Sequence, residues 1–232
     1  MDTIIRGFAE AFRLLITLDP DVLNITYRTL QVSGIATAIS ILIGIPIGTG
    51  LALTRFFGRG LMVSVVNFGM GLPPVVVGFV TWIFLMRYGP LGMLGLLYTP
   101  TAMIIAQAVI ASPLVAGFTM AAIQAINPKL RLQILSLGTT RLQYLLLLLW
   151  EARLGILAAI IAGFGGVISE VGASMMVGGN IRGYTRVLTT ATVLEVSKGS
   201  FELAAGLSII LLVLSFGIMG ALSWLQQRGR HS

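Results

Sequence analysis

The sequence has no cysteine, and its one histidine, His231, is the penultimate residue. Without cysteine there is no disulfide, no thiolate metal site and no cysteine nucleophile, and a lone histidine at the chain end supports neither a metal site nor histidine-based catalysis. Charge is scarce as well: Lys, Arg, Asp and Glu make up 10% of the 232 residues, against about 25% in a typical soluble domain. So few charged side chains cannot cover a water-exposed surface, which excludes a soluble domain and, with it, most enzymes.

Apolar residues take the place of the missing charges. Hydrophobic residues make up 56% of the chain, and the mean hydropathy is +0.98. A helix needs about 20 apolar residues to cross a bilayer, and charge-free runs mark four such helices, over 29–54, 60–86, Thr101–Gln124 and 203–227. A fifth crossing is expected around the shorter core Leu154–Ser169. The sequence therefore predicts a single all-α integral membrane domain over residues 1–232.

Residues 1–27 are expected to form an amino-terminal interfacial segment. Within it, Ile4–Leu18 has apolar residues at helical spacing but carries Arg6, Glu10 and Arg13. This pattern predicts an amphipathic helix that lies on the membrane surface and does not cross it.

Basic residues in compact loops indicate the orientation. Cytoplasmic loops carry an excess of Lys and Arg, which predicts that one face is cytoplasmic, namely the face with Arg55, Arg59, Lys129, Arg131, Arg141, Arg228 and Arg230. The other face has as many basic residues, so the assignment depends on the compactness of the loops. Residues 127–144 form a cytoplasmic loop in which Asn127-Pro128 predicts the start of a short helix. This helix either binds a partner or is a loop helix without one.

Two of the predicted spans contain helix-breaking or small residues. Gly71 and Pro73-Pro74 fall in the middle of the span over 60–86, where proline removes a helix hydrogen bond, so a kink or break is expected. A broken helix at membrane depth indicates either a transport path or a packing kink, and both remain open. Gly44 and Gly48 in the first span have the small-residue spacing of close helix contact.

Polar residues gather after the fourth crossing. Glu170, within Ser169–Ala173, is either a functional ionisable group near membrane depth or a side chain that reaches the outer interface. The segment Gly178–Arg186 follows, with Arg182 and Arg186 among glycines and hydroxyls. Guanidinium and backbone N–H groups both donate to oxyanions, so this segment is either an anion-binding element or a solvated loop.

The chain resembles the permease subunits of binding-protein-dependent ABC importers. In that family a cytoplasmic loop with an EAA-type motif and a fixed glycine forms the coupling helix that docks on the ATPase. The matching residues are Leu132, Gln133 and Ile134, then Gly138, followed by Thr139 and Arg141, although the Glu-Ala-Ala element itself is missing. The resemblance implies a type I ABC importer (MetI-like) permease fold, with about five transmembrane helices, the interfacial helix and the coupling helix.

Two further motifs resemble the oxyanion branch of this family. Leu72-Pro73-Pro74 is similar to the LPP element of molybdate and sulfate permeases, and Ser169–Ala173 running into Gly179-Asn180-Ile181 is similar to their GEFGA and GNI elements. Trp150–Arg153 and the string SEVGASMMVGGNIRGYTRVLTTA look most like tungstate permeases. The substrate-path residues implied are Pro73, Pro74, Glu170, Gly172, Gly179 and Asn180. Glu170 would repel an oxyanion, so we expect it to orient neighbouring backbone or to pair with an arginine.

The resemblance also implies partners and a location. A permease homodimer would work with two cytoplasmic ABC ATPases and an external or periplasmic tungstate-binding protein, in the lipid of a prokaryotic inner or plasma membrane and without nucleic acid. The chain has no GxxxxGK[ST] phosphate loop, so ATP and Mg would be held by the ATPase; the permease itself would bind no cofactor and catalyse no reaction. The alternatives are a molybdate or sulfate permease, or an ion-coupled secondary anion carrier.

Overall fold

The computed structural model describes Arg13, Thr17 and residues 19–228, and within these residues the regular elements are all helical. Most of the predicted interfacial helix over Ile4–Leu18 lies outside the described residues. The elements are α2 (Pro20–Leu53), α3 (Arg59–Met70), α4 (Pro74–Leu85), the 3-10 turn η1 (Gly92–Leu94), α5 (Pro100–Gln124), α6 (Pro128–Ser136), α7 (Arg141–Glu151), α8 (Arg153–Ile168), α9 (Gly172–Gly178), α10 (Leu188–Ser197) and α11 (Phe201–Arg228).

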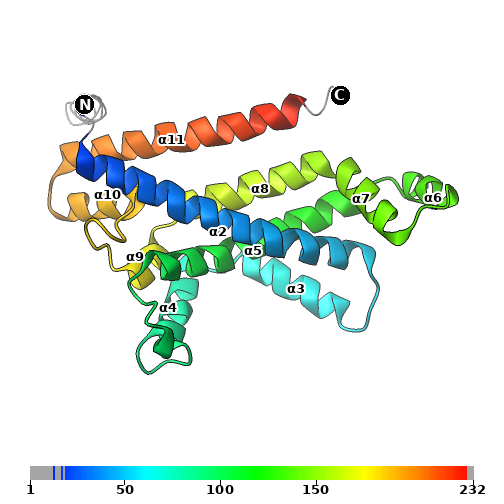
Figure 1. Cartoon of the computed structure of the whole chain (residues 1–232), viewed down its shortest axis with the longest axis horizontal. Coiled ribbons are helices and arrows are strands. Elements are labelled where there is room, and N and C mark those ends of the chain that lie inside the picture. The colour runs from blue at the N-terminus through cyan, green and yellow to red at the C-terminus, as the bar shows by residue number, and fades with distance from the viewer. Residues whose placement is uncertain (1–12, 14–16, 18, 229–232) are drawn as a thin grey trace.

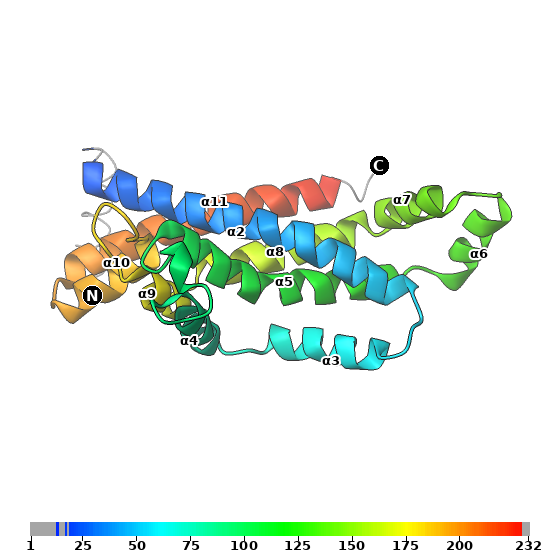
Figure 2. The ribbon, with the colours of Figure 1, turned by 60° about the horizontal axis from the view of Figure 1, so that its bottom comes forward.

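Helix α5 lies at the centre of the bundle, with α2 across one side of it and α8 along another (Figures 1 and 2). Small residues allow α2 and α5 to approach closely. A Cβ atom on Gly44 would lie 2.7 Å from Val115 Cβ, and one on Gly48 would lie 2.3 Å from the carbonyl oxygen of Ala116. The prediction that these glycines serve helix packing is confirmed.

Up to five of the predicted crossings are present in the described chain. Three helices, α2, α5 and α11, are each long and apolar enough to cross a membrane. Two more crossings are present if each bent pair of helices counts as one. The chain bends by 104° between α3 and α4 and by 66° between α7 and α8. Because α3 ends at Met70 and α4 begins at Pro74, the break predicted at Pro73-Pro74 is confirmed.

The first membrane helix is longer than the sequence analysis predicted. Asp19 accepts hydrogen bonds from the backbone N–H groups of Asp21 and Val22, and Pro20 occupies the first helical position. This cap starts α2 at Pro20, so residues 20–27 are continuous with the predicted first span in one helix. The expected boundary came from Arg28, but a charged residue near a helix end does not stop the helix.

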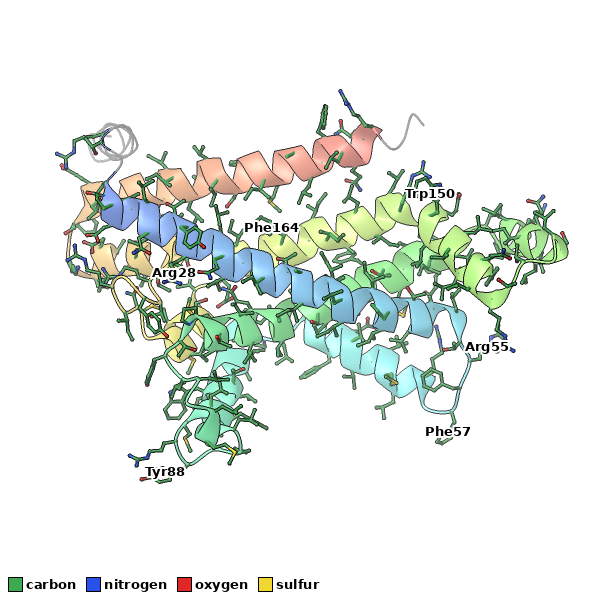
Figure 3. All side chains as sticks on the ribbon, viewed as in Figure 1. Arg28, Arg55, Phe57, Tyr88, Trp150 and Phe164 are labelled. Atoms are coloured by element: carbon green, nitrogen blue, oxygen red, sulfur yellow. The ribbon has the colours of Figure 1, made fainter. Side chains whose placement is uncertain are left out.

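The two ends of the bundle are different in character. At one end lie the start of α2, α10 and the loop between α9 and α10; at the opposite end α6 is the outermost helix, next to α7 (Figure 1). Arg55 and Phe57, in the loop after α2, lie toward the α6 end, while Arg28 lies toward the other (Figure 3). We call the α6 end the cytoplasmic end, following its basic residues, and the opposite end the outer end.

Candidate substrate path and coupling helix

The structure brings the two interrupted segments of the predicted path together. A Cβ atom on Gly172, the first residue of α9, would lie 2.6 Å from Val75 Cγ2, and one on Gly78 would lie 2.6 Å from Ala173 Cα. Helices α4 and α9 are therefore in close contact along their first turns. The bend at Pro73-Pro74 lies beside the segment that carries Glu170 and Gly172.

Glu170 is a buried residue that positions its neighbours. It is 7% exposed, and its Oε1 accepts the backbone N–H of Ala173 at 2.7 Å, inside the first turn of α9. Its carbonyl oxygen accepts the hydroxyl of Thr189, on α10, at 3.0 Å. Of the two roles expected for this carboxylate, it therefore orients neighbouring backbone. Because it already accepts the N–H of Ala173, that donor is not available to a passing oxyanion.

Gly179 and Asn180 follow the last residue of α9. A helix of 7 residues is about 10 Å long, so they lie about that far from Gly172. Gly179 has a φ of +69°, and a Cβ atom there would lie 2.9 Å from Tyr98 Cδ1. The backbone N–H of Tyr98 donates to the carbonyl oxygen of Val177 at 2.8 Å. Tyr98 and Asn180 also have positive φ, of 61° and 51°. Glycine is thus required at position 179 both by its backbone conformation and by the tyrosine ring.

The two arginines of the outer loop have partners within the protein. Arg186 Nε donates to Asn180 Oδ1 at 3.3 Å, and Arg182 forms an ion pair with Asp21 at the start of α2. The hydrogen bond to the Asp21 carboxylate raises the pKa of the Arg182 guanidinium above its ordinary value. A cavity of about 430 Å³ is lined by both arginines and by Asp21. This segment is therefore held to α2 by an exposed ion pair, and the anion-binding element and the solvated loop both stay predictions.

Two contacts near the path were missed by the sequence analysis. Nothing in the sequence indicates that Tyr98 belongs to this site, because it lies in a turn-rich loop and contacts Gly179 only after folding. Gln107 on α5 donates from Nε2 to Ser174 Oγ on α9 at 2.9 Å, and both side chains are buried. Here a signal was available, because Gln107 is an amide in the middle of an apolar run.

Helix α6 is fixed on one side and open on the other. Ile134 is buried with Ile123 and Leu148, in a cluster contributed by α5, α6 and α7. Leu132 and Gln133, by contrast, are exposed. The predicted coupling residues therefore divide between an anchor at Ile134 and a surface available to a partner.

The turn after α6 depends on Gly138. This residue has a φ of +72°, and a Cβ atom there would meet nothing within 4 Å. Its requirement for glycine is thus conformational and not steric. Thr139 Oγ1 donates to the carbonyl oxygen of Ile134 at 3.1 Å, and Thr140 then caps α7, whose first residue is the exposed Arg141.

Comparison with known proteins identifies the family. The sequence profile described as "Binding-protein-dependent transport system inner membrane component" matches residues 40–231. The chain belongs to this family. It is thus a multi-pass membrane component of an ABC transport system, as the sequence analysis predicted, and it lies in the inner membrane.

Individual relatives agree with this assignment. The chain is 39% identical to "Tungstate uptake system permease protein TupB" of Peptoclostridium acidaminophilum, over 98% of this chain and 100% of that protein. It is 41% identical to "Probable anion ABC transporter permease protein" of Haloferax volcanii, over 84% of this chain and 86% of that one. The fold is shared with a chain of the MetNI methionine ABC transporter in an inward-facing form, with a TM-score of 0.77 at 19% identity, over 92% of this chain and 98% of that chain. The predicted MetI-like fold is confirmed.

Proposed function

We propose that the chain is the permease subunit of an ATP-driven importer that carries tungstate into the cytoplasm. The observation that carries the choice of substrate is the similarity, over nearly the whole length of both chains, to a permease of a tungstate uptake system. The segments that form the candidate path, at the α3–α4 bend and around α9, lie within the matched length. Molybdate and sulfate are the alternative substrates.

An oxyanion needs a polar route because a dianion cannot enter hydrocarbon unaided. Conduction also requires binding that is weak enough to release the ion. The meeting of the α3–α4 bend with the start of α9 supplies irregular backbone inside the membrane domain, which is tolerated where it is buried in protein or lines a cavity. Pro73, Pro74 and Gly172 are the path residues at this point, and Gly179 and Asn180 are those at the outer end of α9. Glu170 orients the first turn of α9 between them.

A second copy of the chain would complete this path. Helix α4 has 12 residues, about 18 Å, which is too short to cross a bilayer alone. The chain bends by 104° between α3 and α4. Helix α4 keeps large apolar side chains on its surface, among them Val75, Phe79 and Phe84, each about half exposed. Figure 3 shows Tyr88 at the tip of the loop that follows α4, far from the bundle axis. This projecting unit is the surface we assign to the homodimer.

The partner ATPase would dock on α6. The exposed Leu132 and Leu135 of α6, Leu137 directly after it and the nearby Arg141 form an apolar surface with a basic border beyond the end of the bundle. Two ATPase subunits bind ATP and Mg, close on each other and move the two α6 helices, which opens the path outward toward a binding protein that delivers the anion. Hydrolysis returns the path to the inward state.

The test is uptake of tungstate into proteoliposomes that contain the chain with its partner ATPase and binding protein. We expect uptake that requires ATP and the binding protein and that excess molybdate or sulfate reduces little. Strong competition by either anion would replace the substrate and keep the importer. Uptake that proceeds without ATP would contradict the importer and favour an ion-coupled carrier.

A further inference from the structure

Arg131 joins the helix that meets the ATPase to the central helix of the membrane domain. It lies on α6, and its guanidinium Nη2 donates to the carbonyl oxygen of Ile123 in the last turn of α5. The arginine is half-buried, and its Nε is buried without a hydrogen-bond partner. A charged group in this half-buried position costs solvation free energy, whereas Lys129 on the same helix is exposed.

The chemistry of this contact suits a helix C-terminus. The last four carbonyl groups of a helix have no partner within it, and together they carry a partial negative charge. The Ile123 carbonyl already accepts the backbone N–H of Ile126 at 3.2 Å, and the guanidinium adds a charged donor to it and complements the helix dipole. Lysine could supply the charge but not the planar, multiply donating group of arginine. Arg131 therefore fastens α6 to α5 through a polar contact, next to the apolar contact that Ile134 makes with Ile123.

Helix α5 is the element through which a movement at α6 would reach the path. It packs against α2, α3, α4, α8 and α9, and the bond between Gln107 and Ser174 links it to α9 in the interior. We propose that Arg131 is a positioning residue that transmits the displacement of α6 to α5, and through α5 to the segments around α9. This proposal rests on the proposed function, in which α6 docks on the ATPase.

The chain contains a matched control. Arg59, at the start of α3, donates from Nε to the carbonyl oxygen of Leu51 at 2.8 Å, near the end of α2. As with Arg131 and Ile123, the arginine reaches back eight residues to the cytoplasmic end of a membrane helix. Arg59 is likewise half-buried, but it does not lie on α6. Replacing it removes an equivalent cap without touching the link between α6 and α5.

The first experiment measures amide hydrogen exchange of residues 120–126 in the assembled permease–ATPase complex, before and after trapping with ATP and vanadate. We expect trapping to change the exchange rates in the wild-type complex and in R59Q. In R131Q we expect the change in exchange rate on trapping to be at least about threefold smaller than in the wild type. A threefold difference corresponds to a modest coupling free energy between two sites. R131K, which keeps the charge, should retain a larger share of the wild-type change. A full change in R131Q, or an equal loss in R59Q, would overturn the proposal.

The second experiment measures the number of anions carried per ATP hydrolysed, in the same vesicles. We expect this ratio to fall at least about threefold in R131Q and to stay at the wild-type value in R59Q. A purely structural role would reduce uptake and hydrolysis together and leave the ratio unchanged, which would contradict the proposal. Absence of ATP-dependent uptake in wild-type vesicles would instead contradict the proposed function, and the exchange experiment, which needs no transported anion, would still decide the role of Arg131.

Discussion

The outer and cytoplasmic ends of this permease are held together in different ways. At the outer end, side chains join segments far apart in the sequence: Thr29 on α2 accepts the backbone N–H of Leu188 on α10 at 2.9 Å, and Arg182 pairs with Asp21 across 161 positions. At the cytoplasmic end, arginines reach back eight residues to the helix that precedes them. The outer end is thus built as one unit, whereas α6 is fastened mainly to its own neighbours and is able to follow a partner.

This difference predicts that changes at the cytoplasmic end affect transport more than stability. The largest effect is expected for Gly138→Val. The backbone at position 138 has a φ of +72°, so valine there would be a β-branched residue in the left-handed region, at a cost of about 1–2 kcal/mol. The turn would relax by moving α6. We expect ATP-dependent uptake to be abolished while the protein remains in the membrane, measured by vesicle uptake and by the amount of protein extracted from membranes.

Gly138→Asn is the control for that experiment, because asparagine adopts the left-handed conformation more readily than other residues with a side chain. It should keep a substantial part of the uptake. Normal uptake in Gly138→Val would contradict the prediction that the turn at Gly138 couples α6 to transport.

Changes at the outer end should lower stability and transport together. Glu170→Ala leaves the buried N–H of Ala173 without the acceptor it has at 2.7 Å. A buried donor left unpaired costs about 1–3 kcal/mol, so we expect a clear fall in the midpoint of thermal unfolding of the purified protein and a parallel fall in uptake. Glu170→Gln keeps an acceptor oxygen and should lose less. Full stability in Glu170→Ala would show that the carboxylate does not hold α9.

Much of this architecture could be predicted because its signals are local. Proline at positions 73 and 74 breaks a helix wherever it occurs, and Asn127 followed by proline starts one. Length without charge locates spans in the same way. The start of α2 was misplaced for a local reason too: Asp19 and Pro20 form a cap, but Arg28 was taken as the boundary.

Two contacts near the site could not be predicted, because each joins residues that only folding brings together. The ring of Tyr98 against Gly179 and the bond from Gln107 to Ser174 have no fixed spacing in the sequence. Glu170 was recognised as unusual because it is a carboxylate near membrane depth, and the repulsion an oxyanion would meet led to two expected roles, orienting backbone or pairing with an arginine. Its actual partner, the N–H of Ala173, is only three residues away.

A smaller effect at the outer end is expected for Thr29→Val. This change keeps the shape of the side chain but removes the oxygen that accepts the N–H of Leu188. A buried donor left unpaired costs about 1–2 kcal/mol, so the unfolding midpoint should fall by less than in Glu170→Ala. Thr29→Ser, which keeps the hydroxyl, should lie between this variant and the wild type. If Thr29→Val and the wild type unfold at the same temperature, the buried link between α2 and α10 does not stabilise the outer end.

The smallest effect is expected for Arg182→Ala, although its ion pair spans the longest sequence separation of the contacts compared here. The two side chains of the pair are 70% and 53% exposed, and exposed ion pairs contribute little because water and salt screen them. We expect a slight fall in the unfolding midpoint at low ionic strength that disappears in high salt, measured against Asp21→Asn and the double variant. A large loss that persists in high salt would mean that the pair, and not the buried bonds of Thr29 and Glu170, holds the outer end together. Surface charge would then be the main feature that stabilises the outer end.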